Sequence, residues 1–238
     1  MLRLENITVG FGGLTALANV TLEVGARELV GLVGPNGAGK TTLFNVISGL
    51  ARPKAGTASF NSVNLLRKPV QARARIGIAR TFQIPQPLHE LTVRQNLIVA
   101  QTFGAGHRNA RRIDEILDFI GLKRKAEENA ADGLALSEHK ALEVGKALAT
   151  EPKLILLDEV LAGLETAGKR QFMQTLKRMH QEAGLAIIII EHDIETILAL
   201  CQRAVVLDFG KVIADQTPEE IFRNPAVMRS YTGATPGA

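Results

Sequence analysis

The chain has 238 residues and is 46% hydrophobic, so it is long enough to bury a sizeable core in one large domain or two small lobes. Its net charge of +4 is modest and scattered, and gives little support to a nucleic-acid or membrane partner. No apolar run approaches the ~20 residues of a membrane helix. The single cysteine, Cys201, excludes an internal disulfide, and we expect it to be a buried, small apolar side chain in a reducing interior. We expect no signal peptide, and any membrane role would act through partners.

The first part of the chain is predicted to be β-structure. Apolar residues recur at strand spacing in 2–9, and 14–24 predicts a second strand that ends at Gly25. Residues 56–66 are typical of a hairpin or edge strands. Phe11 lies between the first two strands, and by itself it is more typical of a core or turn aromatic than of a ligand contact.

A glycine-rich loop follows the apolar stretch 29–33 and precedes a helix-like stretch. Its residues are Gly34, Pro35, Asn36, Gly37, Ala38, Gly39, Lys40, Thr41 and Thr42. This order of strand, loop and helix matches G-x-x-x-x-G-K-[ST], in which backbone N–H groups and a helix N-terminus cradle phosphates. We expect Lys40 to reach the β- and γ-phosphates of a nucleotide and the Thr41 hydroxyl to hold Mg²⁺.

The middle of the chain is predicted to contain a strand and then a helical block. Residues 76–82 predict a strand that ends at Gln83, and 92–149 predict a helical block. Basic residues gather before it, and we interpret them as a solvated face: Arg67, Lys68, Arg73, Arg75 and Arg80.

An α/β pattern then resumes. Continuous apolar runs at 154–157 and 186–190 predict strands buried on both faces, with a helix at 166–183 between them. A helix at 194–200 and strands at 204–207 and 212–213 complete the pattern.

Polar residues stand at the carboxyl ends of these buried strands, where ligands bind in open α/β sheets. Asp158 after four aliphatic residues is expected to bind Mg²⁺. Glu159 is placed to polarise the attacking water, a role that typically contributes ~10²–10⁴-fold in rate. His192 is a candidate contact for the γ-phosphate or that water, although a lone histidine at a strand end is more often a structural hydrogen-bonder.

Over nearly its whole length the chain resembles the ATP-binding subunit of ABC transporters. The resemblance implies that Phe11 stacks on adenine, that 34–42 is Walker A, and that Asp158 and Glu159 are Walker B and the catalytic glutamate. It further implies that Gln83 contacts Mg²⁺, that 162–165 is the D-loop, and that His192 is the switch histidine. The implied fold is a P-loop ATPase core with a mostly parallel α/β sheet, an N-terminal antiparallel β portion and an inserted helical subdomain.

The resemblance also implies a division of the chain. A single ATPase domain, residues 1–238, would comprise a nucleotide-binding α/β core at 1–83 and 141–238. The helical subdomain would occupy 84–140.

Finer features are similar to the larger ATPase subunit of branched-chain amino-acid uptake systems. They are Arg80-Thr81-Phe82-Gln83, Leu91-Thr92-Val93, Asn96, Leu142-Glu143-Val144, Ala147-Leu148-Ala149 and Tyr231-Thr232-Gly233. The resemblance implies transmembrane permease subunits, a second identical or different ATPase subunit, and an extracytoplasmic binding protein as an indirect partner. It implies peripheral attachment to the cytoplasmic face of the inner membrane and no nucleic-acid partner.

One motif departs from the family. The expected Leu-Ser-Gly-Gly-Gln-like signature falls at 134–138, where only Leu134 survives; a register shifted by two residues would recover Leu136-Ser137. Ala135 removes a hydroxyl, and Glu138 brings negative charge toward phosphate. We expect Ser137 to compensate in part, as a helix N-cap whose hydroxyl or amide faces phosphate. The site that this signature completes on a partner would then bind nucleotide or hydrolyse it weakly.

Two rival functions remain open on the sequence. The same ATPase could serve urea or amide uptake or lipid-linked export, because an ATPase subunit does not contact cargo. A soluble ATP-dependent switch in DNA repair or translation is the other, although such relatives usually carry a long coiled-coil insertion or two ATPase domains in one chain.

Overall fold

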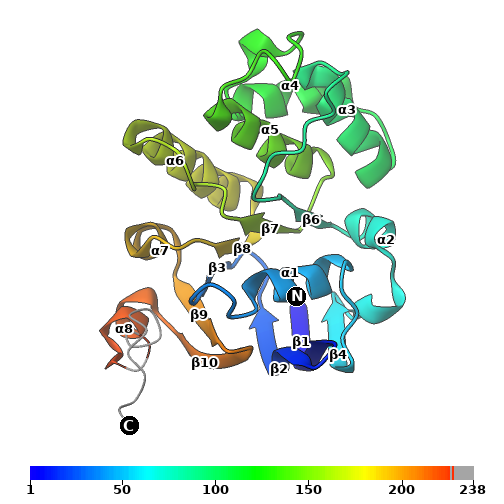
Figure 1. Ribbon diagram of the computed structural model, residues 1–238. Coiled ribbons are helices and arrows are strands. Elements are labelled where there is room, and N and C mark those ends of the chain that lie inside the picture. Colours follow the sequence, from blue (N-terminus) through cyan, green and yellow to red (C-terminus); the bar gives the residue numbers. More distant parts are fainter. Residues whose placement is uncertain (226, 228–238) are drawn as a thin grey trace. The chain divides into compact units, whose positions relative to one another are not determined.

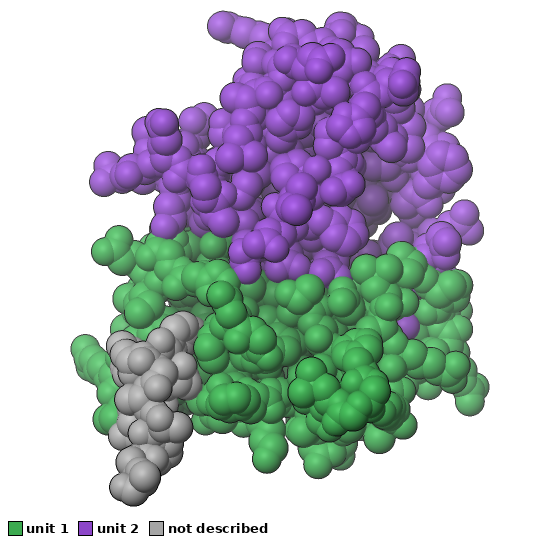
Figure 2. Space-filling model, viewed as in Figure 1, with its two compact units in different colours: residues 1–70, 186–238 green, residues 71–185 purple. Residues whose placement is uncertain are grey.

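The computed structural model describes residues 1–225 and 227, and the predicted motif Tyr231-Thr232-Gly233 lies outside them. The chain forms two compact units, drawn in different colours in Figure 2. Unit 1 contains Met1–Val70 and the segment from Ala186 onward, and unit 2 contains Gln71–Leu185. Within the described part of the chain, no helix is both long and apolar enough to cross a membrane.

Unit 1 begins with an antiparallel sheet in the order β2-β1-β4-β5. Its strands are β1 (Leu2–Phe11), β2 (Leu14–Val24), β4 (Ala55–Phe60) and β5 (Val63–Asn64). The predicted hairpin is confirmed, because β4 and β5 pair around Asn61 and Ser62, which both have positive φ. Leu2 and Leu4 of β1 are buried, as are Ile7 and Val9 after a shift of register, so one face of this sheet covers the core.

Unit 1 also contains three parallel strands and one antiparallel edge strand, in the order β10-β9-β3-β8. They are β3 (Leu29–Val33), β8 (Ala186–Ile190), β9 (Arg203–Asp208) and the antiparallel β10 (Lys211–Gln216). Every residue of β3 and β8 is buried, as their continuous apolar runs predicted. The helices of this unit are α1 (Lys40–Ser48), α7 (Ile194–Leu200) and α8 (Pro218–Arg223), and the short η1 covers Leu65–Arg67 (Figure 1).

Unit 2 contains a parallel strand pair and most of the helical structure. The strands are β6 (Ile78–Arg80) and β7 (Leu154–Asp158). The helices are α2 (Val70–Arg75, which starts at the unit boundary), α3 (Val93–Gly104), α4 (Ala110–Phe119), η2 (Lys123–Lys125), α5 (Leu136–Ala149) and α6 (Thr166–Ala183) (Figure 1). Gly145 lets α5 approach its neighbours closely, because a Cβ there would lie 2.6 Å from Ile120 and 3.1 Å from Leu97.

Several expectations need adjustment. The strand expected at 76–82 is only three residues long, and the helical block consists of three α-helices and the short η2. The compact units divide the chain at 70/71 and 185/186, and the predicted division at 83/84 and 140/141 stays a prediction. The solvated face was wrong for two of its members, because Arg73 is buried and the side chain of Arg80 is only 7% exposed. Cys201 is buried, as expected.

Candidate nucleotide-binding site

The glycine loop of unit 1 has a backbone that needs its glycines. Gly34, Gly37 and Gly39 have φ of 142°, 81° and 105°, in the region that side chains rarely adopt. A Cβ at Gly34 would overlap the carbonyl oxygen of Leu207, and one at Gly39 would lie 2.7 Å from that of Ala16. The loop is therefore folded tightly against β2 and the end of β9.

The side chains of the loop divide into a buried base and an exposed top. Lys40 is 6% exposed, and its Nζ donates hydrogen bonds to the carbonyl oxygens of Gly34 (2.6 Å) and Pro35 (2.9 Å). Ala38 is buried, whereas Asn36, Gly37 and Thr41 are exposed and Pro35, Gly39 and Thr42 are half-buried. The ammonium group thus lies inside the curve of the loop, where bound phosphates would need a cation.

Strand pairing brings His192 to the same edge of the sheet as the glycine loop. β8 runs parallel to β3 with Ile190 opposite Leu32, and both strands end at this edge. His192 is the second residue after β8 and its side chain is exposed. Asp193 then caps α7 by accepting hydrogen bonds from the backbone N–H and the hydroxyl of Thr196.

Phe11 is the last residue of β1 and is 57% exposed, so it is not a core aromatic. It pairs with Leu14 at the end of the β1–β2 hairpin. Residues 16–18 of β2 border the glycine loop: Ala16 lies against Gly39, and Ala18 donates to the carbonyl oxygen of Gly210, whose own N–H donates to Ala38. An exposed ring on this hairpin is compatible with stacking on a base.

Unit 2 contains three further residues predicted for the site, Gln83, Asp158 and Glu159. Asp158 is 4% exposed at the end of β7, and its Oδ2 accepts a hydrogen bond from Arg80 Nη2 at 2.9 Å. The Asp158 backbone N–H donates to the hydroxyl of Thr81. A buried carboxylate is stable only with such partners, and here they come from the strand beside it.

Gln83 and Glu159 are in direct contact, as Gln83 Nε2 donates to Glu159 Oε2 at 2.6 Å. Glu159 has a φ of 50°, which is uncommon for a residue with a side chain and is often found at functional sites. Its backbone carbonyl accepts from Lys140 Nζ, which also donates to the carbonyl oxygen of Ala162. One buried lysine of α5 therefore holds both the catalytic candidate and the predicted D-loop.

The signature region corrects one expectation. α5 begins at Leu136 with Ala135 as its N-cap, so Ser137 is the second residue of the helix and not its cap. Ala135 thus stands at the cap position, and the choice between the two registers of the signature stays a prediction. Ser137 is exposed, and its predicted contact with phosphate stays a prediction.

Glu138 does not stand alone at the start of α5. Its Oε2 accepts hydrogen bonds from the backbone N–H of Ala135 (2.8 Å) and from Lys125 Nζ (2.7 Å). Burial alone would raise the pKa of Glu138, but the hydrogen bonds from Lys125 and Ala135 outweigh it and lower the pKa. The same contact raises the pKa of Lys125. The negative charge that the sequence placed near phosphate is thus shared with a lysine of the same unit.

The segment after Gln83 is held to α5 by the buried Glu143 and the half-buried Lys146. Glu143 is 5% exposed, and its Oε1 accepts from the backbone N–H of Gln86 (2.9 Å) and from Lys146 Nζ (2.6 Å). Lys146 Nζ in turn donates to the carbonyl oxygen of Gln86 at 2.6 Å. The N–H and the carbonyl of Gln86 are therefore both hydrogen-bonded to side chains on one turn of α5.

Sequence reasoning missed the residues that support the site. Arg80 was placed on a solvated face, and Lys140 and Glu143 were assigned no structural role. Only Glu143 could have been noticed from the sequence, because it is a charged residue between the apolar Leu142 and Val144.

The fold and these residues define a class of protein, the nucleoside triphosphatases that hold phosphates on a glycine loop between a parallel strand and a helix. The family model for ABC transporters matches residues 17–162. The chain is 35% identical to the high-affinity branched-chain amino acid transport ATP-binding protein LivG of Salmonella typhimurium, over 98% of both chains. It is 30% identical to the lipopolysaccharide export system ATP-binding protein LptB of Haemophilus influenzae, over 98% of this chain and 97% of that protein.

Solved structures agree with the sequence relatives. A crystal structure of an ATP-binding cassette of an ABC transporter in its ADP conformation matches with a TM-score of 0.89 and 30% identity, over 98% of this chain and 99% of that one. The chain belongs to the ABC transporter ATP-binding family. It is an ATPase subunit that binds ATP, and the predicted fold class is confirmed.

Proposed function

We propose that the chain powers uptake of branched-chain or other hydrophobic amino acids. The observation that carries this is the full-length similarity to LivG, whose name states such transport. No contact with cargo is needed in this subunit, because its part is to bind and hydrolyse ATP. The cargo is therefore assigned through the relatives, and the chemistry through the residues of the two units.

The residues of the two units divide the work of hydrolysis. In unit 1 the glycine loop and Lys40 hold the phosphates, Phe11 stacks on adenine, and His192 contacts the γ-phosphate or the attacking water. Mg²⁺ would be held by Thr41, Gln83 and Asp158, whose hydroxyl, amide and carboxylate oxygens are ligands that this ion prefers. Bound Mg²⁺ would neutralise charge that develops on the phosphates.

Glu159 is the proposed general base, and the contact with Gln83 supports this role. A single hydrogen bond of 2.6 Å links the carboxylate to the amide that is expected at the metal. A water bound beside this pair would be oriented by the Glu159 carboxylate, whose position Gln83 holds.

Two ATPase subunits would pack head-to-tail, each ATP lying between the glycine loop of one and the signature of the other. ATP favours the closed dimer because only that state makes both sets of phosphate contacts. The second subunit is either identical or a relative. Here the signature 134–138 would complete the partner's site, and the segment from Gln83 to Leu91 would dock a transmembrane permease subunit. A binding protein outside the membrane would deliver cargo, and the chain would lie on the cytoplasmic face.

The variant Glu159→Gln tests the assignment of the base. It keeps a group able to contact Gln83 but cannot accept a proton, so we expect ATP binding to persist while hydrolysis falls by about 10²-fold or more. The closed dimer should accumulate in ATP, as measured by light scattering. Glu182→Gln, on the exposed face of α6, is the matched control and should hydrolyse ATP normally. Hydrolysis by Glu159→Gln at the wild-type rate would exclude Glu159 as the base.

A second candidate cargo is a lipid-linked molecule, which the similarity to LptB favours. Transport by the chain reconstituted with the permease subunits encoded beside it separates the two. Uptake of leucine, isoleucine or valine supports the proposal, and activity with an export complex alone contradicts it.

A further inference from the structure

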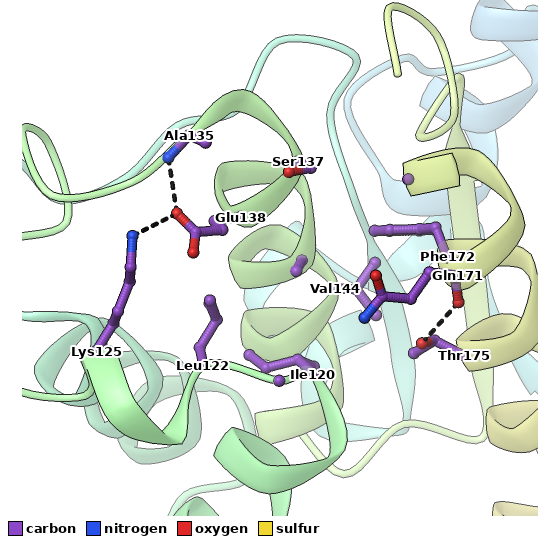
Figure 3. Close-up of a pocket in the computed structure, with 13 residues that line it drawn as sticks. Ile120, Leu122, Lys125, Ala135, Ser137, Glu138, Val144, Gln171, Phe172 and Thr175 are labelled. Atoms are coloured by element: carbon purple, nitrogen blue, oxygen red, sulfur yellow. Dashed lines mark hydrogen bonds and ion pairs between the residues drawn. The ribbon is translucent and has the colours of Figure 1, made fainter. Parts of the chain in front are cut away.

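A cavity in unit 2 is lined in part by the signature residues Ala135, Ser137 and Glu138, and the hydrolysis scheme assigns it no ligand. Its volume is about 460 Å³, within the range of sites for small ligands. One face of α5 contributes Ser137, Glu138, Ala141 and Val144. Figure 3 shows Lys125 and Glu138 together on one side of the view, and Gln171, Phe172 and Thr175 of α6 on the other.

The cavity exists because small residues line it. A Cβ added at Gly168 of α6 would meet no atom within 4 Å, so this position opens on empty space. Gly121 and Ala141 also contribute little side-chain volume to the lining. The apolar part of the wall is formed by Ile120, Leu122, Val144 and Phe172.

One end of the cavity carries two opposite charges with remaining hydrogen-bonding capacity. Lys125 Nζ donates to Gly133 O (2.9 Å) and to Glu138 Oε2 (2.7 Å), which leaves one of its three N–H groups. Glu138 Oε1 accepts no hydrogen bond from the described residues, since both of its contacts are to Oε2. The side chains of Lys125 and Glu138 are 34% and 27% exposed, so a ligand can reach them.

These charges select among ligands. Lys125 Nζ and Glu138 Oε2 are only 2.7 Å apart, so a ligand with a single charge would be attracted by one of them and repelled by the other. A ligand that carries both charges close together would be attracted by both. An α-amino acid has this arrangement, with its carboxylate for Lys125 and its ammonium for Glu138. An aliphatic side chain would then lie against Ile120, Leu122 and Val144.

We propose that this cavity binds a zwitterionic amino acid with an aliphatic side chain, and that binding slows ATP turnover. The regulatory part rests on the proposed function, because the ligand class is then the imported cargo itself. Glu138 Oε2 holds the N–H of the cap residue Ala135, and Lys125 holds the carbonyl of Gly133. A ligand bound to the remaining N–H of Lys125 and to Glu138 Oε1 would tie the turn at 133–138 more firmly. This turn contains the signature, so the signature could adjust less to the partner's ATP. Accumulated cargo would thereby restrain its own uptake.

Calorimetry on the full chain tests the binding. L-leucine should bind. Isoamylamine and 4-methylpentanoate, which each lack one of its charges, should bind with an affinity at least roughly tenfold lower. Lys125→Met should weaken leucine binding by a similar factor. Ala141→Leu should abolish it by filling the cavity without touching a charge, and thermal melting will show whether this variant is folded. Lys123→Met is the matched control, because Lys123 also pairs with a carboxylate but does not line the cavity.

The outcomes separate this proposal from the proposed function. Equal binding of leucine and its two singly charged analogues, or no loss in Lys125→Met, would overturn the site whatever the transporter carries. With the assembled complex, leucine should lower ATP turnover for wild type and the Lys123→Met control, but not for Lys125→Met. Binding without any change in turnover would overturn the regulatory part. Failure of the complex to transport leucine would instead count against the proposed cargo.

Discussion

The buried ion pair between Arg80 and Asp158 offers a sharp test of how unit 2 is held together. The two side chains are 7% and 6% exposed, and their charged atoms are 2.9 Å apart. Arg80→Met keeps the apolar stem but removes the guanidinium group that donates to this buried carboxylate. Breaking a buried pair in this way costs about 3–5 kcal/mol in the free energy of unfolding. We expect the midpoint of urea unfolding, followed by circular dichroism, to fall by roughly 1–2 M.

A matched control and a second variant show whether burial is the reason. Arg94 bonds to Asp114 and Glu127, but the side chains of these partners are 51% and 72% exposed, so Arg94→Met should cost about 1 kcal/mol or less per pair. Adding Asp158→Asn to Arg80→Met removes the buried charge and should recover part of the loss. Equal stability of Arg80→Met and Arg94→Met would refute the reasoning, because burial would then have no effect on the cost.

Three further results are expected. Gly34→Ala should weaken ATP binding at least tenfold in a fluorescent-nucleotide titration, because its Cβ would overlap Leu207 O; unchanged affinity would contradict the described loop. Burial raises the pKa of the Cys201 thiol to about 12, so on the order of 10⁻⁴ of it is thiolate at pH 8, and Ellman's reagent should react far faster in urea than with the native chain. The pKa of Glu138 is lowered in the fold, so its carboxylate stabilises the chain above the unfolded pKa of about 4.3. The stability difference between wild type and Glu138→Gln should therefore be present at pH 7 and disappear as the pH falls below 4; a constant difference would argue against the Lys125 pair as its source.

The sequence predicted the elements better than the contacts between them. Strand β7 was foreseen because four aliphatic residues in a row are typical of a strand covered on both faces. Helix α6 begins and ends where its periodicity predicted. The pairing of Arg80 with Asp158 joins residues 78 positions apart, and no local pattern carries that information.

The start of α5 shows a second limit. Serine is a common N-cap, so Ser137 was expected to fill that role. The helix begins two residues earlier because Glu138, at the third helical position, reaches back to the N-cap backbone N–H and supplies half of a capping box without any cap side chain. To predict this start from the sequence, one would have to prefer a cap made by the Glu138 side chain to the more common cap made by a serine hydroxyl.

The fastening of Gln86 to α5 has a mechanical consequence. Ile84 and Leu88, on either side of Gln86, are 70% and 42% exposed, so a partner that presses on this segment would contact them. The segment can slide along α5 only if two charge-assisted hydrogen bonds break, the one that Gln86 N–H donates to Glu143 and the one that Lys146 donates to Gln86 O, at about 1.5–3 kcal/mol each. A smaller force would instead displace the helix together with the segment. A displacement of the segment near Gln86 would thus move α5 as a rigid body, and with it Ala135 at the start of the helix.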